Sequence, residues 1–356
     1  MPFSAESYFQ TQTPPTTLQH DTDAVREFVQ RQTRDGKKIV LVTSGGTTVP
    51  LELNVVRYLD NFSAGTRGAT SAEYFLSAGY AVIFMHRQFS LQPFSRHYSH
   101  STNPFLDFLE VEPPSPSDPD AVPRISVIKE NREFLLRVLA AYRDAHSKGT
   151  LLTLTFVTIN DYLFLLRAVS EQMASLGRRS MYYLAAAVSD FFLPTQRLSE
   201  HKIQSGKGSL QIEMDQVPKI LKPLVSEWTR EGFVVSFKLE TDPKLLIPKA
   251  RMALERYGHH VVIGNDLARR KFEVLFVSRV PRTVIDAGQS PTGPPIDSTI
   301  IEPVTDAPPT QSGADYTETW LILEEKDRNS VEIEEGIVDR LVKMHDAWIE
   351  AGPRIP

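Results

Sequence analysis

The chain has 356 residues, 41% of them hydrophobic, and its 39 basic and 44 acidic residues leave a net charge of −5. This length can build one large core or two modest ones, and so mild a charge argues against a protein that binds nucleic acid or a membrane surface. The absence of cysteine excludes disulfides, thiolate metal sites and a cysteine nucleophile. Without a bilayer-spanning apolar run or a secretory pattern, we expect a cytoplasmic protein.

The beginning of the chain predicts a tail, a helix and a buried strand. Residues 1–20 are polar and proline-bearing, so we expect a flexible tail there, followed by a helix over residues 21–34. The next segment, KKIVLVTSGG, is apolar, rich in β-branched residues and closed by two glycines. This pattern is typical of a buried parallel strand that enters a tight loop.

The same alternation of strand and helix continues along the chain. We expect further strands in AVIFMH, LLTLTFVT, MYYLAAAVSD, GFVVSFKLE, HHVVIGND, FEVLFVS and TETWLILEE. We expect helices over residues 67–78, 125–148, 161–176, 217–228, 242–257 and 331–350. Residues 281–316 are rich in proline, serine, threonine and glycine, which indicates a loop insertion, although STIIEPV could pair briefly as an edge strand.

This alternation implies a largely parallel sheet that is covered by helices on both faces, in a single domain over residues 21–356. In such sheets ligands bind at the carboxyl ends of the strands, where the strand order reverses. Each unusual loop of this chain directly follows a predicted strand. We therefore expect these loops to meet at one edge of the sheet.

Two of the loops are rich in glycine and hydroxyl groups. TSGGTTVPLE contains Gly45 and Gly46, which would let backbone N–H groups approach a phosphate or a ribose, although paired glycines after a strand more often form only a tight bend. DNFSAGTRG offers Asn61, Ser63 and Thr66 in front of a helix N-terminus, where negative charge is favoured. An elaborate helix cap explains this second loop about as well, so both interpretations stay open.

Three later segments carry further polar groups. In AAAVSDFF, small alanines precede Asp190, a carboxylate that would meet a metal or a hydroxyl, or else cap a turn. In SEHKIQSGKG, Lys202 would close over a polyphosphate, although such lysines are more often merely solvated. In SFKLETD and IGND, Phe237 would stack on a base or lie in the core, Lys238 would meet phosphate and Asn265 would contact a polar edge. Their shared position favours a nucleotide-type pocket.

Taken together, these segments resemble the phosphopantothenoylcysteine synthetase family, the phosphopantothenate–cysteine ligases, in its eukaryotic stand-alone form. The resemblance covers roughly residues 38–278 and rests on VTSGGTTVPLE, VRYLDNFSAGTRGATSAEYFLSAGY, YLAAAVSDFF, EHKIQS, SFKLETD and VIGND. It implies a three-layer α/β/α Rossmann-like fold with a mostly parallel central sheet and a dimerisation flap. It also implies a homodimer whose small-molecule substrates are 4′-phosphopantothenate and L-cysteine.

The implied reaction uses ATP, or CTP as in bacterial members, together with Mg²⁺, and passes through an acyl-adenylate. The resemblance assigns catalytic roles to Asn61, which would contact the acyl phosphate, and to Lys202, which would neutralise the triphosphate. The implied nucleotide-binding residues are Gly45, Gly46, Ser63, Gly65, Gly68, Ala186, Ala187, Asp190, Phe237 and Asn265. Asp190 would also assist Mg²⁺, which phosphates and water would mostly hold.

Some assignments follow the family pattern less closely. The candidates for gripping the substrate are Arg57, Arg67 and Lys238. Ala64 stands where many relatives have a second serine, and the segment around Lys202 contains fewer lysines than the bacterial loop.

Two other functions compete with the ligase. An NAD(P)-dependent oxidoreductase predicts a spaced-glycine fingerprint after the first strand, where this chain has SGGTTVP. A non-catalytic nucleotide-sensing protein has little need for an amide that stabilises an intermediate, so the presence of both Asn61 and Lys202 argues against it.

Overall fold

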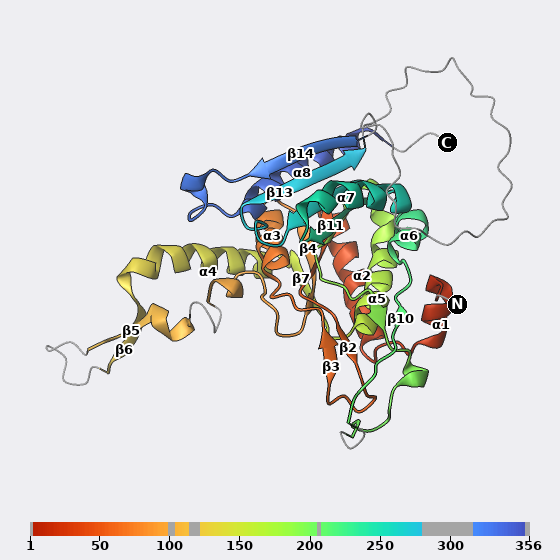
Figure 1. Cartoon of the computed structure of the whole chain (residues 1–356). Helices are drawn as coiled ribbons and strands as arrows, with labels where there is room; N and C mark the ends of the chain where they lie inside the picture. Colours follow the sequence, from red (N-terminus) through yellow and green to blue (C-terminus); the bar gives the residue numbers. More distant parts are fainter. Residues whose placement is uncertain (1–2, 99–103, 114–121, 205–207, 280–315, 353–356) are drawn as a thin grey trace, which may run out of the picture.

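The computed structural model describes residues 3–98, 104–113, 122–204, 208–279 and 316–352. Its core is an eight-stranded sheet (Figure 1). The strand order is β14 (Tyr316–Ile322), β13 (Glu273–Arg279), β12 (Val261–Asp266), β11 (Phe233–Glu240), β8 (Ser180–Leu184), β1 (Ile39–Ser44), β4 (Ala81–Arg87) and β7 (Leu151–Phe156). All pairs from β12 to β7 are parallel, whereas β13 pairs antiparallel with both β12 and β14.

The order of the six parallel strands places a reversal in the middle of the sheet. From β1 the chain moves outward in one direction through β4 to β7, then returns to β8 on the other side of β1 and moves outward through β11 to β12. This is the doubly wound order, in which ligands bind at the carboxyl ends of the two strands that flank the reversal. The sheet therefore points to the ends of β1 and β8.

Helices cover both faces of the sheet, which confirms the predicted three-layer fold. Ile39 and Leu41 of β1 face α2 (Leu18–Arg34) and α5 (Ile159–Met173), and α7 (Pro243–Tyr257) packs on the same face further along. Val40 and Val42 face α3 (Thr66–Ser77) and α8 (Ile333–Glu350) on the opposite side. This alternation is possible because successive side chains of a strand point to opposite faces.

The helix ends follow the local sequence. Thr158 and Asp161 form a reciprocal capping box at the start of α5. Asp242 caps α7, and Gly258 ends it with a φ of +69°, a left-handed conformation that favours glycine. The predicted helix over residues 242–257 is therefore confirmed almost to the residue.

The first twenty residues differ from the predicted flexible tail. A short helix, α1 (Ala5–Thr11), packs on the core, and α2 already begins at Leu18. The side chain of Tyr8 is completely buried, its hydroxyl donates to Asn160 Oδ1 at 3.2 Å, and Phe9 contacts Phe164 edge-on. These aromatic side chains, interspersed among polar residues, anchor the segment.

Three further predictions need correction. Residues 125–127 are not helical but belong to β6 (Arg124–Val127), which pairs with β5 (Leu109–Glu112), and α4 (Arg132–Ser147) begins later. The strand predicted over residues 181–190 ends at Leu184, because the following backbone turns to pair with the loop after β1. The helix predicted over residues 217–228 is a short α6 (Leu221–Pro223) followed by a π-helical turn (Leu224–Trp228), since two prolines interrupt the hydrogen-bond ladder.

Three small hairpins complete the fold. They are β2 (Thr48–Pro50) with β3 (Tyr58–Asp60), β5 with β6, and β9 (Phe191–Phe192) with β10 (Asp215–Gln216). We call residues 104–113 and 122–147, which comprise β5, β6 and α4, the arm; it projects away from the sheet (Figure 1). Of the predicted insertion over residues 281–316, only Tyr316 lies within the described residues, as the start of β14. Among the described residues no helix is long and apolar enough to cross a bilayer.

Candidate functional site

The loops after β1 and β8 join at the reversal of the sheet. The N–H of Ala187 donates to the carbonyl of Gly45 at 2.8 Å, and the N–H of Thr47 donates to the carbonyl of Ala187 at 3.0 Å. The N–H of Asn61 donates in turn to the carbonyl of Thr47 at 3.0 Å. A continuous backbone network therefore brings Gly45, Ala187 and Asn61 together, three residues that the sequence assigned to one site.

The hydroxyl groups of the first loop have different partners from those expected. Thr43 Oγ1 accepts the N–H of Ala186 at 3.2 Å, and Thr47 Oγ1 accepts the N–H of Ser189 at 2.9 Å. The sequence suggested that such hydroxyls would contact a ligand. In the structure these two fix the 186–189 backbone instead, a role that sequence reasoning missed.

Gly46 is required by a close approach of two backbone segments. A Cβ atom on Gly46 would lie 1.6 Å from the carbonyl oxygen of Asn61. No side chain fits there, so glycine lets the segment that begins at Asn61 lie directly against the end of β1. Gly46 thus positions Asn61 through the protein's own packing.

The glycines of the second loop allow α3 to pack closely on β1. A Cβ on Gly68 would lie 2.4 Å from Ser44 Oγ, whose hydroxyl donates to the carbonyl of Gly65 at 3.0 Å. Gly65 precedes α3 with a φ of +83°, and no side chain caps the helix among the described residues. The N–H groups of the first turn of α3 are thus available for an anion at the reversal of the sheet.

The side chains of Ser63 and Asn61, both in this loop, differ in their use. Ser63 Oγ accepts the N–H of Gly65 at 3.3 Å, a local turn contact before α3 that leaves the first turn of the helix without a side-chain cap from the described residues, contrary to the helix-cap interpretation. Asn61 is exposed, and its amide has no hydrogen-bond partner among the described residues. The Asn61 amide is therefore free to meet a substrate, and so is the exposed hydroxyl of Thr66, which also has no hydrogen-bond partner among the described residues.

Phe237 lies on β11 and Asn265 on β12, the next two strands of the sheet after β8, and both side chains are on the face covered by α3. The Phe237 ring lies edge-on against Tyr183, with ring centroids 4.9 Å apart. Asn265 is buried, and its Oδ1 accepts from Arg67 Nη2 at 3.4 Å. These two side chains extend the candidate site from β8 along the carboxyl ends of β11 and β12.

Arg67 is engaged by the protein on several sides. Besides Asn265, its guanidinium contacts Glu334 Oε1 at 2.8 Å and the carbonyl of Arg270 at 2.5 Å. Burial raises the pKa of the Glu334 carboxyl, while the positive charge of Arg67 acts in the opposite direction. Arg67 therefore connects α3 to α8 and to the loop after β12, and it orients Asn265.

Lys238 lies on the other face of the sheet from Phe237. Its ammonium is 3.4 Å from Glu240 Oε1, and Lys249 of α7 contacts the other oxygen of the same carboxylate at 2.8 Å. Because neighbouring residues of a strand point to opposite faces, Lys238 faces α7. The structure does not bring it together with the α3 N-terminus.

Lys202 and Arg57 lie in a second part of the site, formed by the β2–β3 hairpin and the segment 199–204. Arg57 Nη2 donates to the carbonyl of Ile203 at 2.7 Å. The Lys202 side chain is exposed, with no partner for its ammonium among the described residues. Between them lies the completely buried carboxylate of Glu52, which sequence reasoning missed although a glutamate between Leu51 and Leu53 was a signal.

Asp190 is exposed at the end of the segment that leads away from β8. Among the described residues no three histidine, aspartate or glutamate side chains lie close enough together to hold a metal ion. A single carboxylate suits Mg²⁺ that is coordinated mainly by phosphate and water. Asp190 fits that limited role.

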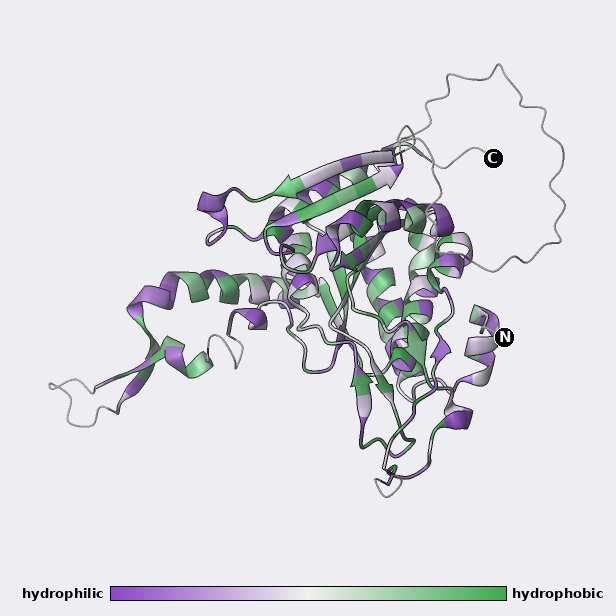
Figure 2. Cartoon of the chain, in the orientation of Figure 1, coloured by the Kyte–Doolittle hydropathy of each residue, from purple (hydrophilic) through white to green (hydrophobic). Residues whose placement is uncertain are grey.

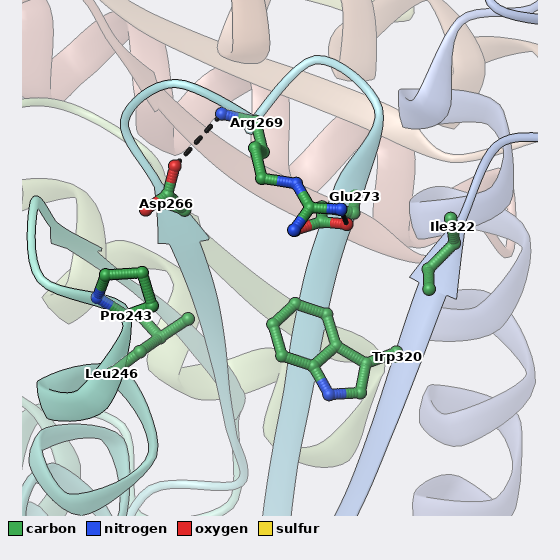
Figure 3. A pocket seen from close by; sticks show the side chains of 7 residues that line it. All are labelled: Pro243, Leu246, Asp266, Arg269, Glu273, Trp320 and Ile322. Carbon is green, nitrogen blue, oxygen red and sulfur yellow. Dashed lines mark hydrogen bonds and ion pairs between the residues drawn. The ribbon is translucent and has the colours of Figure 1, made fainter. Parts of the chain in front are cut away.

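A separate cavity of about 330 Å³ lies beyond Asp266 at the end of β12 (Figure 3). It is lined by Pro243, Leu246, Asp266, Arg269, Glu273, Trp320 and Ile322. Two of its charged groups pair with each other, since Arg269 Nη2 is 2.7 Å from Glu273 Oε2. Leu246 belongs to α7, so the cavity lies on the α7 face and not beside Phe237 and Asn265.

Comparison with known proteins gives one consistent result. The family model of the DNA/pantothenate metabolism flavoprotein C-terminal domain matches residues 35–102 and 153–286. A human phosphopantothenate–cysteine ligase is 41% identical over 329 residues, which cover 92% of each chain. The Saccharomyces cerevisiae phosphopantothenate–cysteine ligase CAB2 is 39% identical over 366 residues, which cover 97% of this chain and 86% of the yeast protein.

Solved structures agree with these relatives. A Cab2 mutant in complex with phosphopantothenate-cysteine superposes with a TM-score of 0.78 at 39% identity and covers 97% of this chain and 99% of that chain. The DNA/pantothenate metabolism flavoprotein from Streptococcus pneumoniae has a TM-score of 0.51 at 16% identity and covers 88% of this chain and 99% of that chain, a likeness of fold alone.

Proposed function

The chain belongs to the phosphopantothenate–cysteine ligase family, and on that premise we propose that it joins 4′-phosphopantothenate to L-cysteine with ATP as cosubstrate. The products would be 4′-phosphopantothenoyl-L-cysteine, AMP and pyrophosphate, as a step of coenzyme A synthesis. The cytoplasm is the proposed location, since a chain without cysteine has no use for an oxidising compartment in forming disulfides.

The chemistry requires activation of the carboxylate. In the first step a carboxylate oxygen of phosphopantothenate attacks the α-phosphorus of ATP, and the bond from that phosphorus to pyrophosphate breaks. In the second step the amine of cysteine attacks the acyl carbon, AMP leaves with the bridging oxygen, and the amine loses a proton. The protein supplies no nucleophile in this scheme, so catalysis depends on positioning and on stabilising negative charge.

The observation that carries the proposal is the meeting of Asn61 with the uncapped N-terminus of α3 at the reversal of the sheet. The helix N-terminus favours phosphate, and the exposed Asn61 amide can donate to the acyl phosphate where negative charge develops. Lys202, on the segment that lies against the β2–β3 hairpin, would neutralise the triphosphate as pyrophosphate leaves.

The nucleotide would lie along the carboxyl ends of β8, β11 and β12. The small side chains of Ala186 and Ala187 leave room beside the backbone, Phe237 offers an aromatic edge for the base, and Asn265 provides a polar group whose orientation Arg67 fixes. We therefore assign Arg67 to positioning and retain Arg57 as the candidate for contact with the substrate. When Mg²⁺ is bound with the triphosphate, it would neutralise phosphate charge, with Asp190 as an auxiliary ligand.

The loop after β1 argues against the oxidoreductase alternative. In a dinucleotide-binding fold the helix starts directly after the first strand, on a spaced-glycine turn. Here β1 ends at Ser44 and α3 begins only at Thr66, with the β2–β3 hairpin between them. The loop therefore lacks the geometry that a pyrophosphate bridge of NAD(P) uses.

The arm supports a homodimer. Its side chains include exposed apolar residues, with Val111, Ile125 and Leu136 each about 70% exposed, and Figure 2 shows apolar positions along it. A two-stranded hairpin is marginal in isolation, and so much exposed apolar surface in a projecting element is typical of an interface. We propose that the arm packs against a second copy of the chain.

An omission assay tests this function. Purified protein is incubated with Mg-ATP, or Mg-CTP, phosphopantothenate and cysteine, each left out in turn, while pyrophosphate and AMP are followed. The ligase forms pyrophosphate only with phosphopantothenate present, and free AMP with amide only once cysteine is added. Nucleotide binding without turnover of either nucleotide would favour the sensing protein instead.

A further inference from the structure

The buried carboxylate of Glu52 joins two segments that are far apart in the sequence. Its Oε2 accepts the backbone N–H of Arg57 at 3.0 Å, inside the β2–β3 hairpin. Its Oε1 accepts the backbone N–H of Ile203 at 3.3 Å, next to Lys202. One carboxylate therefore serves both the hairpin that leads to Asn61 and the segment that carries Lys202.

Other hydrogen bonds align the same two segments. The N–H of Leu53 donates to the carbonyl of Ser199 at 2.9 Å, and the N–H of Asn54 donates to the carbonyl of Glu200 at 3.2 Å. The guanidinium of Arg57 contacts the carbonyl of Ile203. Residues 199–203 thus run beside residues 52–57 like an additional strand.

A stabilised turn alone does not explain this arrangement. A tight hairpin loop requires only the bond from Glu52 to Arg57, whereas the bond to Ile203 spans 151 residues. Burial by itself raises the pKa of the Glu52 carboxyl. Hydrogen bonds from the backbone N–H groups of Arg57, Ile203 and Val56, together with the positive charge of Arg57, outweigh burial and leave the pKa below its usual value. The side chain is therefore an anion that keeps both N–H groups fixed.

We propose that Glu52 is a positioning residue of the ligase, whose carboxylate holds the Lys202 segment against the hairpin that leads to Asn61. In the proposed reaction, Asn61 would stabilise the negative charge of the acyl phosphate, and Lys202 would stabilise that of the departing pyrophosphate. The two must therefore keep one spacing during adenylate formation. This inference rests on the proposed function.

The test compares Glu52→Gln with Lys202→Ala and with the double variant. In Glu52→Gln the side-chain NH₂ group faces a backbone N–H donor, so one of the two hydrogen bonds is lost. We expect kcat for pyrophosphate formation to fall about 10- to 100-fold, with the KM for cysteine unchanged. Because Glu52 acts through Lys202, the double variant is little slower than Lys202→Ala alone. Hydrogen exchange of peptides that cover residues 199–204 is faster in Glu52→Gln.

Glu273→Gln is the matched control, because Glu273 is also buried and paired, with Arg269, on β13, the strand next to the edge strand β14. It should leave kcat and the exchange of residues 199–204 unchanged. The inference would be overturned if the fold-decreases in kcat caused by Glu52→Gln and by Lys202→Ala multiplied fully in the double variant. Hydrogen exchange of residues 199–204 that is unchanged in Glu52→Gln would also overturn it. Inactivity of the unsubstituted protein would instead reject the ligase function, and the exchange measurement would then decide alone whether Glu52 holds the segment.

Discussion

At the scale of single residues, Asn61 has the most specific geometry. Its backbone is fixed by the Thr47 carbonyl and by the absence of a side chain at Gly46, while its amide points to solvent. A side chain held by its backbone and otherwise unpaired is pre-organised for a ligand. We therefore propose Asn61 as the group that would stabilise the acyl phosphate.

We predict that Asn61→Asp retains ATP binding but lowers the rate of amide formation about 100-fold or more. The new carboxylate repels the acyl phosphate that the amide should stabilise, and loss of one such donor typically has an effect of this size. Single-turnover kinetics measure the rate of amide formation, and nucleotide titration measures ATP binding. Asn329→Asp, which makes the same charge change in an exposed turn, is the control; equal rates in both variants would remove Asn61 from the mechanism.

At the scale of elements, α1 shows how few residues can anchor a segment. We predict that Tyr8→Ala lowers the free energy of unfolding by about 3–5 kcal/mol, as for other fully buried aromatic side chains. Tyr8→Phe, which removes only the hydroxyl bonded to Asn160, should lower it by about 1 kcal/mol. Urea denaturation measures both values. A flexible tail would instead give no change in either variant.

The arm gives a second prediction at this scale. Ile125→Asp combined with Leu136→Asp places charges on exposed apolar positions of β6 and α4, so we expect the proposed dimer to dissociate into folded monomers. Light scattering coupled to size exclusion reports the mass, and circular dichroism confirms the fold. Exposed Val331→Asp, outside the arm, is the control. A dimer that persists in the double variant would place the interface elsewhere.

Most regular elements could be predicted from the sequence, because their signals are local. β1 and β4 begin with continuous apolar runs, and α7 has both its aspartate cap and its terminal glycine. The failures depend on tertiary contacts. Residues 124–127 pair with β5 across the arm, and residues 185–190 leave the sheet to bond with Thr43 and Thr47, neither of which a local pattern can indicate.

The candidate site was predictable in part for the same reason. The loop sequences pointed to Asn61, Phe237 and Asn265, and the resemblance to a family gave them their expected roles; the structure places all three at the carboxyl ends of the parallel strands. Glu52 was missed because its second partner, Ile203, is distant in the sequence. Lys238 was included because its ammonium could meet a phosphate, but the alternation of the strand turns it to the opposite face.

At the scale of the whole molecule, buried histidines make stability depend on pH. Burial lowers the pKa of His259 and of His345 to about 4 each, below the ordinary value of 6.5. His345 Nε2 lies 2.8 Å from the Arg178 carbonyl and must donate to it, so Nδ1 accepts from the Tyr80 hydroxyl in the neutral form. Protonation would disturb this arrangement.

We predict that the free energy of unfolding falls by roughly 1–2 kcal/mol per histidine between pH 7 and pH 5. In this window the unfolded chain binds protons that the folded chain does not, so stability is complete above pH 6.5 and decreases toward pH 4. Urea denaturation across the window measures the slope. His345→Gln should be less stable at pH 7, but its free energy of unfolding should change less steeply with pH. A pH dependence equal to that of the unsubstituted protein would contradict the assignment of this effect to His345.

The complete reaction requires every part of the site, and an isotope label follows it directly. We would supply 4′-phosphopantothenate with ¹⁸O in its carboxylate, together with Mg-ATP and cysteine, and analyse the nucleotide and phosphate products by mass spectrometry. An acyl-adenylate mechanism predicts one ¹⁸O atom in AMP, because the carboxylate oxygen that attacks the α-phosphorus leaves with AMP when the amide forms. Label in inorganic phosphate with ADP as the other product would contradict an acyl-adenylate, and the absence of amide would contradict the ligase function itself.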